Sequence, residues 1–300
     1  MSVVGVTALL FLAVAIPASG VSRWLVDHIS RSQQIRSMDP SRQAEASRAQ
    51  RGTLRGGIGA MISPQRTVME YEDLYRLVAR KLAMTPEIVQ RRQYAEMNEL
   101  LERGKVDFAW VCTGAVADLE TRGLAIPLVA PVVSGAPRYR AYLIVRSDGR
   151  FSSLEDLRGH RFALTDPLSL TGRAVVVDQL RSIGETPDTY FRESFFTYAH
   201  DNSVRAVKRG LADGAMVDSL VYDLLAKRYP DEVKDLRIVW ESEWFPTPPI
   251  MVSRREPEKM VRDLREAFTT LHEDPEGRAI LAAIGIDRFV PIDSSSYVGR

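Results

Sequence analysis

The sequence predicts an α/β protein with mainly parallel sheets. From residue 52 onward, short apolar runs of strand character alternate with segments whose apolar residues recur at helical spacing. The chain has 300 residues, and the 45% that are hydrophobic are spread throughout, so it can bury a sizeable core. At roughly 150 residues per domain, this length indicates about two domains. Residues 52–300 contain no internal repeat and no low-complexity tract.

The first half of this region alternates strands with three helices. Strands are predicted at residues 54–62, 87–91, 106–112, 124–133 and 141–145. The third of them, VDFAWVC, is nearly all apolar, which is typical of a strand buried on both faces. Helices are predicted at residues 64–83, 94–103 and 114–122. Ser63 is the expected N-cap of the first helix, and Pro64 suits its first position.

The second half repeats the alternation. Residues 153–159 predict a short helix that ends at a glycine. Strands are then predicted at residues 161–165, 194–197, 214–217 and 236–240, and helices at 171–183, 203–209, 219–227 and 258–271. Between the last strand and the last helix, residues 245–249 (FPTPP) are expected to be extended because proline cannot continue a helix.

Charge and cysteine content exclude several classes of function. The 40 basic and 39 acidic residues give a net charge of +1, so no overall field attracts nucleic acid or an anionic membrane, and any bound anion must be held locally. The single cysteine, Cys112, excludes an internal disulfide framework and a zinc site with several cysteines. We expect no metal, no cofactor and no nucleic-acid partner.

The amino terminus indicates export. Residues 3–18 form an uncharged apolar run followed by small residues, which resembles the core and cleavage site of a signal peptide. This run is short for a membrane span. The alternative is an uncleaved anchor through residues 3–18, because the nearest charges, Arg23, Arg31 and Arg36, all follow the run. We therefore assign residues 1–20 to a signal peptide or membrane anchor and the polar residues 21–51 to a flexible tether.

Small or polar residues follow the predicted strands at five junctions. Ligands of open α/β sheets bind beyond the carboxyl ends of strands. A helix begins at each junction, so free backbone N–H groups and the positive ends of helix dipoles point to one region, which suits a tetrahedral oxyanion. In particular, Ser169, Leu170, Thr171 and Gly172 are predicted to cradle an anion. The five junctions are Ser63, Cys112-Thr113-Gly114, residues 166–172, residues 200–203 and Asp218-Ser219.

A plainer interpretation stands beside this one. Serine, threonine and aspartate are the commonest N-caps, so each of these residues taken alone is more often a cap than a ligand. His200 alone is more often a surface or capping histidine. Asp218 differs because it follows an apolar strand, where a buried carboxylate is costly without a donor. A protonated phosphate or phosphonate oxygen is one such donor.

Seven segments, in this order, resemble the phosphate/phosphite/phosphonate family of ABC-transporter substrate-binding proteins, which are two-domain periplasmic binding proteins. The resemblance covers residues 54–291, nearly the whole chain after its amino-terminal segment. The segments are ISP (62–64), QRRQYAEMNELLERGKVDFAWVCTGAV (90–116), YLIVRSD (142–148), SLEDLRGHRFALTDPLSLTG (153–172), HDNSVRAV (200–207), MVDSLVYD (216–223) and HEDPEGRAILAAIGIDRFVP (272–291).

The resemblance implies the two-lobed periplasmic-binding-protein fold of type 2. Lobe 1 is then residues 52–142 plus 248–300, lobe 2 is residues 143–247, and two crossovers join them near residues 142–146 and 242–251. By position, the family's ligand contacts match Tyr94, Tyr139, Ser169, Thr171, His200 and Asp218. Together with Ser63, Cys112, Thr113, Leu170 and Gly172 from the junctions, these residues form the predicted ligand site.

Two positions depart from the family pattern. Leu170, the middle residue of the Ser-x-Ser/Thr turn, offers only its amide. Leu220 stands where a carboxylate would follow two residues after Asp218. We therefore expect the oxyanion contacts to be intact, whereas contacts to a substituent on phosphorus remain open.

The resemblance implies an extracytoplasmic protein that captures phosphonate, phosphite or phosphate and delivers it to an ABC permease. We expect a periplasmic monomer that is not an enzyme. One alternative is a sensor subunit that binds an oxyanion, or arsenite through Cys112, and signals to a histidine kinase. The other is a cysteine-nucleophile enzyme in which a helix amino terminus lowers the pKa of Cys112 and His200 acts as the base. The simplest role for Cys112 is that of a small buried hydrophobe.

Overall fold

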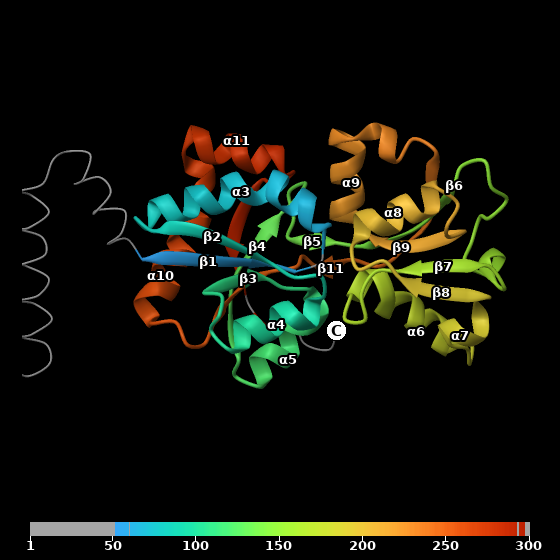
Figure 1. Ribbon diagram of the computed structural model, residues 1–300, viewed down its shortest axis with the longest axis horizontal. Coiled ribbons are helices and arrows are strands. Elements are labelled where there is room, and N and C mark those ends of the chain that lie inside the picture. The colour runs from blue at the N-terminus through green and yellow to red at the C-terminus, as the bar shows by residue number, and fades with distance from the viewer. Residues whose placement is uncertain (1–51, 60, 293, 298–300) are drawn as a thin grey trace, which may run out of the picture. The chain divides into compact units, whose positions relative to one another are not determined.

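The structure is a computed structural model that describes residues 52–59, 61–292 and 294–297. The assignments for residues 1–20 and 21–51 therefore lie outside the described residues. Residues from Thr53 onward form one unit built on two separate sheets, each with helices on both faces (Figure 1). The predicted α/β fold class with helix-flanked sheets is confirmed, but the expectation of mainly parallel sheets is wrong, because four strand pairings in the two sheets are parallel and five are antiparallel.

The first sheet has six strands in the order β13-β4-β12-β3-β1-β2. β1 pairs in parallel with β2 and β3, whereas β12 and β13 run antiparallel to their neighbours. Helices α3 and α11 cover one face of this sheet, and α4 and α5 cover the other (Figure 1). The bounds are β1 Thr53–Ile58, α3 Pro64–Lys81, β2 Thr85–Gln90, α4 Tyr94–Glu102, β3 Phe108–Trp110, α5 Val116–Thr121, β4 Ala125–Val132, β12 Ile250–Ser253, α10 Glu258–Thr269, α11 Pro275–Ala283 and β13 Arg288–Pro291.

The second sheet has five strands in the order β10-β6-β9-β7-β8. β7 is parallel to β8 and β9, whereas β6 is antiparallel to both of its neighbours. Helices α8 and α9 lie on one face, and α6 and α7 lie on the other (Figure 1). The bounds are β6 Ala141–Arg146, β7 Arg161–Leu164, α6 Val175–Ser182, α7 Pro187–Tyr190, β8 Glu193–Phe196, α8 His200–Lys208, β9 Gly214–Asp218, α9 Ser219–Arg228 and β10 Leu236–Glu241.

A short ribbon accompanies the chain where it passes between the sheets. β5 (Arg138–Tyr139) pairs antiparallel with β11 (Phe245–Pro246). The chain leaves the six-stranded sheet after β4, enters the five-stranded sheet at β6 and returns after β10 to β12. We refer to the elements around the two sheets as the six-stranded half and the five-stranded half.

Some elements differ from the sequence predictions. The first strand ends at Ile58 instead of residue 62, because the chain turns at Gly59, whose carbonyl accepts the Met61 N–H at 2.7 Å. The helix predicted at 203–209 begins earlier, at His200, after the extended residue Ala199. The short helix predicted at 153–159 is a single 3-10 turn, Glu155–Leu157. The described residues also contain α7, α11, β5, β11, β12 and β13, none of which was predicted as a helix or strand.

Candidate functional site

Seven of the predicted ligand-site residues are buried together between the two halves. They come from separate elements: the start of α4, the end of β3, the β5 ribbon, and the helix starts that follow β7, β8 and β9. Burial raises the pKa of Tyr94 and of Tyr139, and the Asp218 charge adds to the rise in both, so these groups lie within electrostatic reach of one another. The seven are Tyr94, Cys112, Thr113, Tyr139, Thr171, His200 and Asp218.

His200 is the first residue of α8, and its side chain is buried. Its Nδ1 accepts the backbone N–H of Asp218 at 3.0 Å and lies 3.2 Å from the Thr165 hydroxyl oxygen. Burial lowers the pKa of the imidazole to about 3, so the ring is neutral near pH 7. Because Nδ1 is an acceptor, the single ring proton sits on Nε2, which is therefore a hydrogen-bond donor.

Asp218 ends β9 and caps α9. Its Oδ1 accepts the backbone N–H groups of Leu220 at 2.7 Å and Val221 at 3.3 Å, so the capping role considered from the sequence is present. Burial raises the pKa of the carboxyl to about 7, although these two hydrogen bonds act in the opposite direction. Oδ1 is thus an acceptor, and Oδ2 is the oxygen that can carry a proton near neutral pH.

Tyr139 joins the cluster from β5. Burial raises the pKa of its hydroxyl well above the usual value, and hydrogen bonds with the side chains of Thr113 and Thr171 offset part of this effect. The Thr113 hydroxyl also donates to the carbonyl oxygen of Pro246 at 2.9 Å. These contacts tie the cluster to the β5–β11 ribbon, which lies where the chain passes between the halves.

The turn after β7 does not present all four of its predicted anion ligands. Leu170–Ala174 form a π-helical turn, in which the Ala174 N–H donates to the Ser169 carbonyl at 2.9 Å. The Gly172 N–H donates to the Ser169 hydroxyl oxygen at 2.9 Å, which engages this N–H but leaves the Ser169 O–H able to donate to a ligand. The Leu170 N–H forms a hydrogen bond with Cys112. Single-turn π segments occur often at functional sites, and here the turn places Thr171 in the cluster.

Cys112 is a buried thiol, as its simplest role implied, and the lowered pKa that the enzyme alternative requires is absent. Burial raises the pKa of the thiol to about 11, and backbone hydrogen bonds from Leu170 and Gly114 offset only part of this rise. Its Sγ donates to the carbonyl oxygen of Leu168 at 3.5 Å. The helix start does not overcome desolvation, so the sulfur stays protonated and is a poor nucleophile.

Ser63 has other partners. Its N–H and its hydroxyl donate to Asp201 Oδ1 at 2.8 Å and Oδ2 at 2.6 Å, and the side chain makes no capping bond to α3. Asp201 also forms ion pairs with Arg66 at 3.6 Å and Arg205 at 2.8 Å. Ser63 therefore links α3 to α8, and we do not count it among the side chains that face the cluster.

The sequence analysis missed two residues of the cluster. The Thr165 hydroxyl oxygen lies 3.2 Å from His200 Nδ1 and 3.3 Å from the Ser203 hydroxyl oxygen. Its position at the end of a predicted strand was the signal that could have identified it. Tyr71 was placed only on the apolar face of a helix. The Asp218 charge contributes to raising its pKa, after the larger effect of burial, so its hydroxyl lies near this carboxyl.

The two halves are in contact around the cluster. The Tyr94 N–H donates to Asp166 Oδ2 at 3.2 Å, and the His200 N–H donates to the Met61 carbonyl at 3.1 Å. Glu70 pairs with Arg228 and accepts the Tyr229 hydroxyl at 2.6 Å. A cavity beside Tyr94 and Cys112 measures only about 10 Å³, which is the lower limit for one water molecule.

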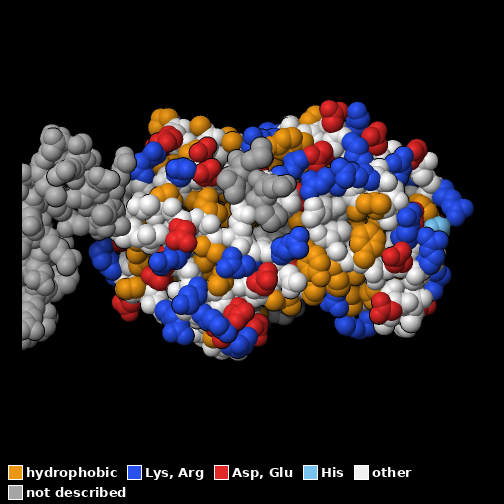
Figure 2. Space-filling model, in the orientation of Figure 1, with side chains coloured by type: hydrophobic (Ala, Val, Ile, Leu, Met, Phe, Trp, Pro, Cys, Tyr) orange, Lys and Arg blue, Asp and Glu red, His pale blue; other side chains and the backbone are white. Residues whose placement is uncertain are grey.

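Two classes of site find no support in the described part of the chain. Within residues 52–59, 61–292 and 294–297, no group of three His, Cys, Asp or Glu side chains is arranged to hold a metal ion. In those same residues no helix has both the length and the apolar character needed to cross a bilayer. On the face shown in Figure 2, basic and acidic side chains are interspersed, as the net charge of +1 suggests.

A family model and a curated relative both describe periplasmic proteins that bind phosphonates. A family model described as "ABC transporter, phosphonate, periplasmic substrate-binding protein" matches residues 57–297. The phosphonates-binding periplasmic protein of Escherichia coli (strain K12) is 24% identical over 252 residues, which are 82% of this chain and 73% of that protein.

Two solved structures have the same fold. One is the binding protein component of an ABC phosphonate transporter from Pseudomonas aeruginosa, with a TM-score of 0.78, 21% identity and coverage of 82% of this chain and 83% of that one. The other is PhnD1 from Prochlorococcus marinus (MIT 9301) in complex with methylphosphonate, with a TM-score of 0.73, 15% identity and coverage of 82% and 94%.

Proposed function

The chain belongs to the family of periplasmic substrate-binding proteins of phosphonate ABC transporters, and on this premise we propose that it captures a small tetrahedral oxyanion between its two halves and delivers it to an ABC permease. The ligand class is phosphonate, phosphite or phosphate. The similarity to a protein whose structure holds methylphosphonate supports this class.

The observation that carries the proposal is the buried pair of His200 and Asp218. Nε2 of the neutral His200 is a donor, and Asp218, with a pKa raised to about 7, shares one proton with the ligand. The hydroxyls of Tyr94, Tyr139 and Thr171 supply further donors. Hydrogen bonds to a charged group contribute about 1.5–3 kcal/mol each. Five of them are enough for roughly micromolar affinity after the lower estimates of the cost of association.

We propose that binding proceeds by closure of the two halves. The anion docks first on the five-stranded half, at Thr171, His200 and Asp218. The six-stranded half then adds Tyr94 and excludes water, which strengthens every hydrogen bond in the site. The lobes proposed for this motion are residues 52–142 plus 248–300 and residues 143–247, except that the first boundary must precede β6, because Ala141 and Tyr142 pair with strands of the five-stranded sheet.

The family is periplasmic, and we propose that this protein acts there as a monomer and docks on its permease after closure. Residues 1–20 are proposed to direct export, either as a cleaved signal peptide or as an anchor through residues 3–18. Residues 21–51 would then connect that segment to the binding unit.

The surroundings of Cys112 weigh against the sensor and enzyme alternatives. Its thiol has a raised pKa of about 11, whereas arsenite capture and nucleophilic attack both use a thiolate. His200 is not placed to activate it, because Nδ1 accepts the Asp218 N–H and burial holds the pKa of the ring at about 3.

Calorimetric titration of the full chain tests the proposal. We expect phosphate, phosphite or methylphosphonate to bind at micromolar to low millimolar concentration, and Asp218→Ala to abolish this binding. Cys112→Ser, which keeps a small side chain at that position, should retain it. Absence of binding by all three anions, or equal binding by Asp218→Ala, would contradict the proposal. Arsenite binding that Cys112→Ser removes, with the phosphorus anions inert, would support the sensor instead.

A further inference from the structure

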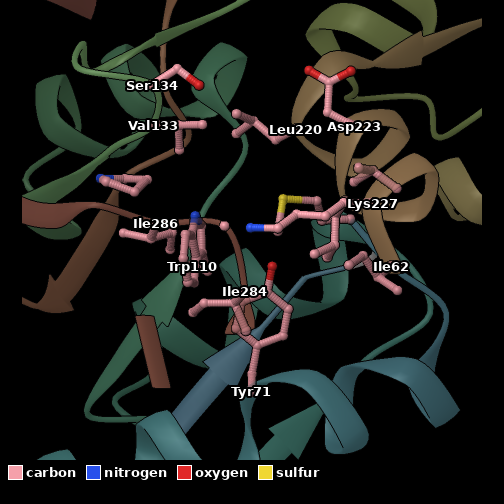
Figure 3. A pocket seen from close by; sticks show the side chains of 15 residues that line it. Ile62, Tyr71, Trp110, Val133, Ser134, Leu220, Asp223, Lys227, Ile284 and Ile286 are labelled. Carbon is pink, nitrogen blue, oxygen red and sulfur yellow. The ribbon is translucent and has the colours of Figure 1, made fainter. Parts of the chain in front are cut away.

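A second and larger cavity adjoins the candidate site. It measures about 170 Å³ and lies between the six-stranded half and α9 (Figure 3). Met61 and Trp110 line this cavity and also the small cavity beside Tyr94 and Cys112, so the two spaces share a wall. Its walls are mainly apolar and include Ile62, Val133, Leu220, Leu224, Ile284 and Ile286.

The cavity is lined by residues that neighbour the carboxyl group of the anion site. Leu220 and Val221 line it, and their backbone N–H groups are the ones that bind Asp218 Oδ1. Tyr71 lines it as well, and its hydroxyl feels the charge of Asp218. A ligand whose oxyanion contacts Asp218 can therefore extend a substituent into this cavity.

Two polar groups in the cavity lack partners among the residues that the structure describes. Tyr71 is 4% exposed and packs its ring edge against Trp110 at 5.3 Å, while its hydroxyl points into the cavity without a hydrogen bond (Figure 3). Lys227 extends from α9 into the same space, and its ammonium group forms no ion pair with a described residue (Figure 3). Lys227 is an exposed residue, so its ammonium group is open to solvent, and together with the Tyr71 hydroxyl it offers a ligand donors that no described residue occupies.

The acidic residue of the cavity, Asp223, is turned away from this pair. Its carboxylate accepts the Tyr142 hydroxyl at 3.4 Å and points away from Lys227 in Figure 3. The cavity thus offers an ammonium and a hydroxyl donor among mainly apolar walls. An acidic group fits these donors, whereas an amine would meet a like charge.

We propose that this cavity receives the organic substituent of the ligand, and that the preferred substituent is a short apolar spacer ending in a carboxylate or similar acid that binds Lys227 and Tyr71. This inference rests on the proposed function, because the phosphorus anion must first occupy the site at Asp218. At about 30 Å³ per water-sized group, the cavity holds roughly six non-hydrogen atoms. Phosphonates that carry a short carboxyalkyl chain are of this size.

Titration of the full chain with matched phosphonates tests the assignment. The ligands are 3-phosphonopropionate, butylphosphonate and 3-aminopropylphosphonate, with methylphosphonate as the reference. We expect 3-phosphonopropionate to bind about tenfold more tightly than butylphosphonate, and the amine to bind most weakly of the three, since a tenfold change is within reach of one charge-assisted contact. In Lys227→Met the ratio of the affinity for 3-phosphonopropionate to that for butylphosphonate should fall to about one. In Tyr71→Phe the same ratio should fall about threefold.

Lys105→Met is the matched control, because Lys105 is exposed in the connection between α4 and β3 and does not line the cavity. It should keep the ratio of the unaltered protein. An affinity ratio near one in the unaltered protein would overturn the inference, and so would a tenfold ratio that survives Lys227→Met. In both cases, binding of methylphosphonate would still uphold the proposed function. Failure of methylphosphonate and all the other anions to bind would overturn both.

Discussion

His200 and Asp218 are both buried, and burial acts on them in opposite directions. It lowers the pKa of the imidazole to about 3 and raises that of the carboxyl to about 7, because in each case the uncharged form is favoured away from water. Between these two values both side chains are neutral. An anion can then enter without meeting a fixed negative charge, and it finds the His200 Nε2–H and the Asp218 proton as donors.

The raised pKa of Asp218 predicts a stability that falls with rising pH. The folded protein holds this proton more tightly than the unfolded chain, so the contribution is fully present below about pH 4 and is lost as the pH rises through 7. A shift of roughly three units corresponds to a contribution on the order of 4 kcal/mol. In Asp218→Asn, the decline in unfolding free energy between pH 5 and 8 should become much shallower in urea titrations.

His200 supplies an internal control for that experiment. Its folded pKa is lowered, so its contribution is present above about pH 6.5 and is lost as the pH falls toward 3. Between about pH 4 and 6.5 this rise opposes the fall caused by Asp218, so it should be largely hidden in the unaltered protein and should appear in Asp218→Asn. An equal loss of stability from pH 5 to 8 in the variant and the unaltered protein would show that another group causes it.

The sequence identified most side chains of the cluster, but it could not assign their partners. Asp218 stood out because a carboxylate followed an apolar strand, and His200 and Thr171 stood out at helix starts. The contact of Ser63 with Asp201 spans 138 positions of the chain, and no local pattern encodes it. The sequence left the pKa of Cys112 open between a buried hydrophobe and a thiol activated by a helix start, and burial decides it, because desolvation raises the pKa to about 11.

Among the elements, the turn after β7 matters most for the site. The sequence predicted one helix over residues 171–183, whereas the structure has the π-helical turn Leu170–Ala174 followed by α6 (Val175–Ser182). Over a single turn, apolar spacing does not separate a π-helix from an α-helix. The start of α11 was readable in Asp274-Pro275, a cap followed by proline at the first position. β12 could not be recognised in the sequence, because it is defined by its pairing with β3 and β4, which lie far away along the chain.

Gly172 predicts the consequence of disturbing this turn. A Cβ atom there would lie 2.3 Å from the Thr165 hydroxyl oxygen and 2.9 Å from His200 Cε1, closer than real contacts allow. Gly172→Ala must push the turn away from His200, and overpacking of this kind costs about 1–3 kcal/mol. We expect a lower melting temperature and at least about tenfold weaker binding of methylphosphonate by calorimetry, since small displacements misalign several donors at once.

Gly114→Ala is the matched control for this prediction. The nearest atom to its added Cβ would be the Leu170 Cβ at 3.6 Å, an ordinary van der Waals distance. This variant should keep both melting temperature and affinity. If Gly172→Ala behaves like Gly114→Ala, the close packing of the turn on His200 does not hold in solution.

At the scale of the whole molecule, polar contacts between the halves surround the cluster. Glu70 with Arg228 and Tyr229 lies on one side, and Tyr94 with Asp166 lies within the site. The β5–β11 ribbon lies where both crossings of the chain run, so rotation there can separate the halves without unfolding either sheet. The sequence predicted two lobes through its resemblance to a family, but the contacts that hold them together join distant residues and emerged only from the structure.

A crystal structure of the protein with methylphosphonate tests most directly the claim that both halves enclose a tetrahedral oxyanion. The account predicts phosphonate oxygens within hydrogen-bonding distance of Thr171, His200 Nε2 and Asp218 Oδ2 from the five-stranded half and of Tyr94 from the six-stranded half. A phosphonate that contacts only one half, or that lies away from His200 and Asp218, would contradict it.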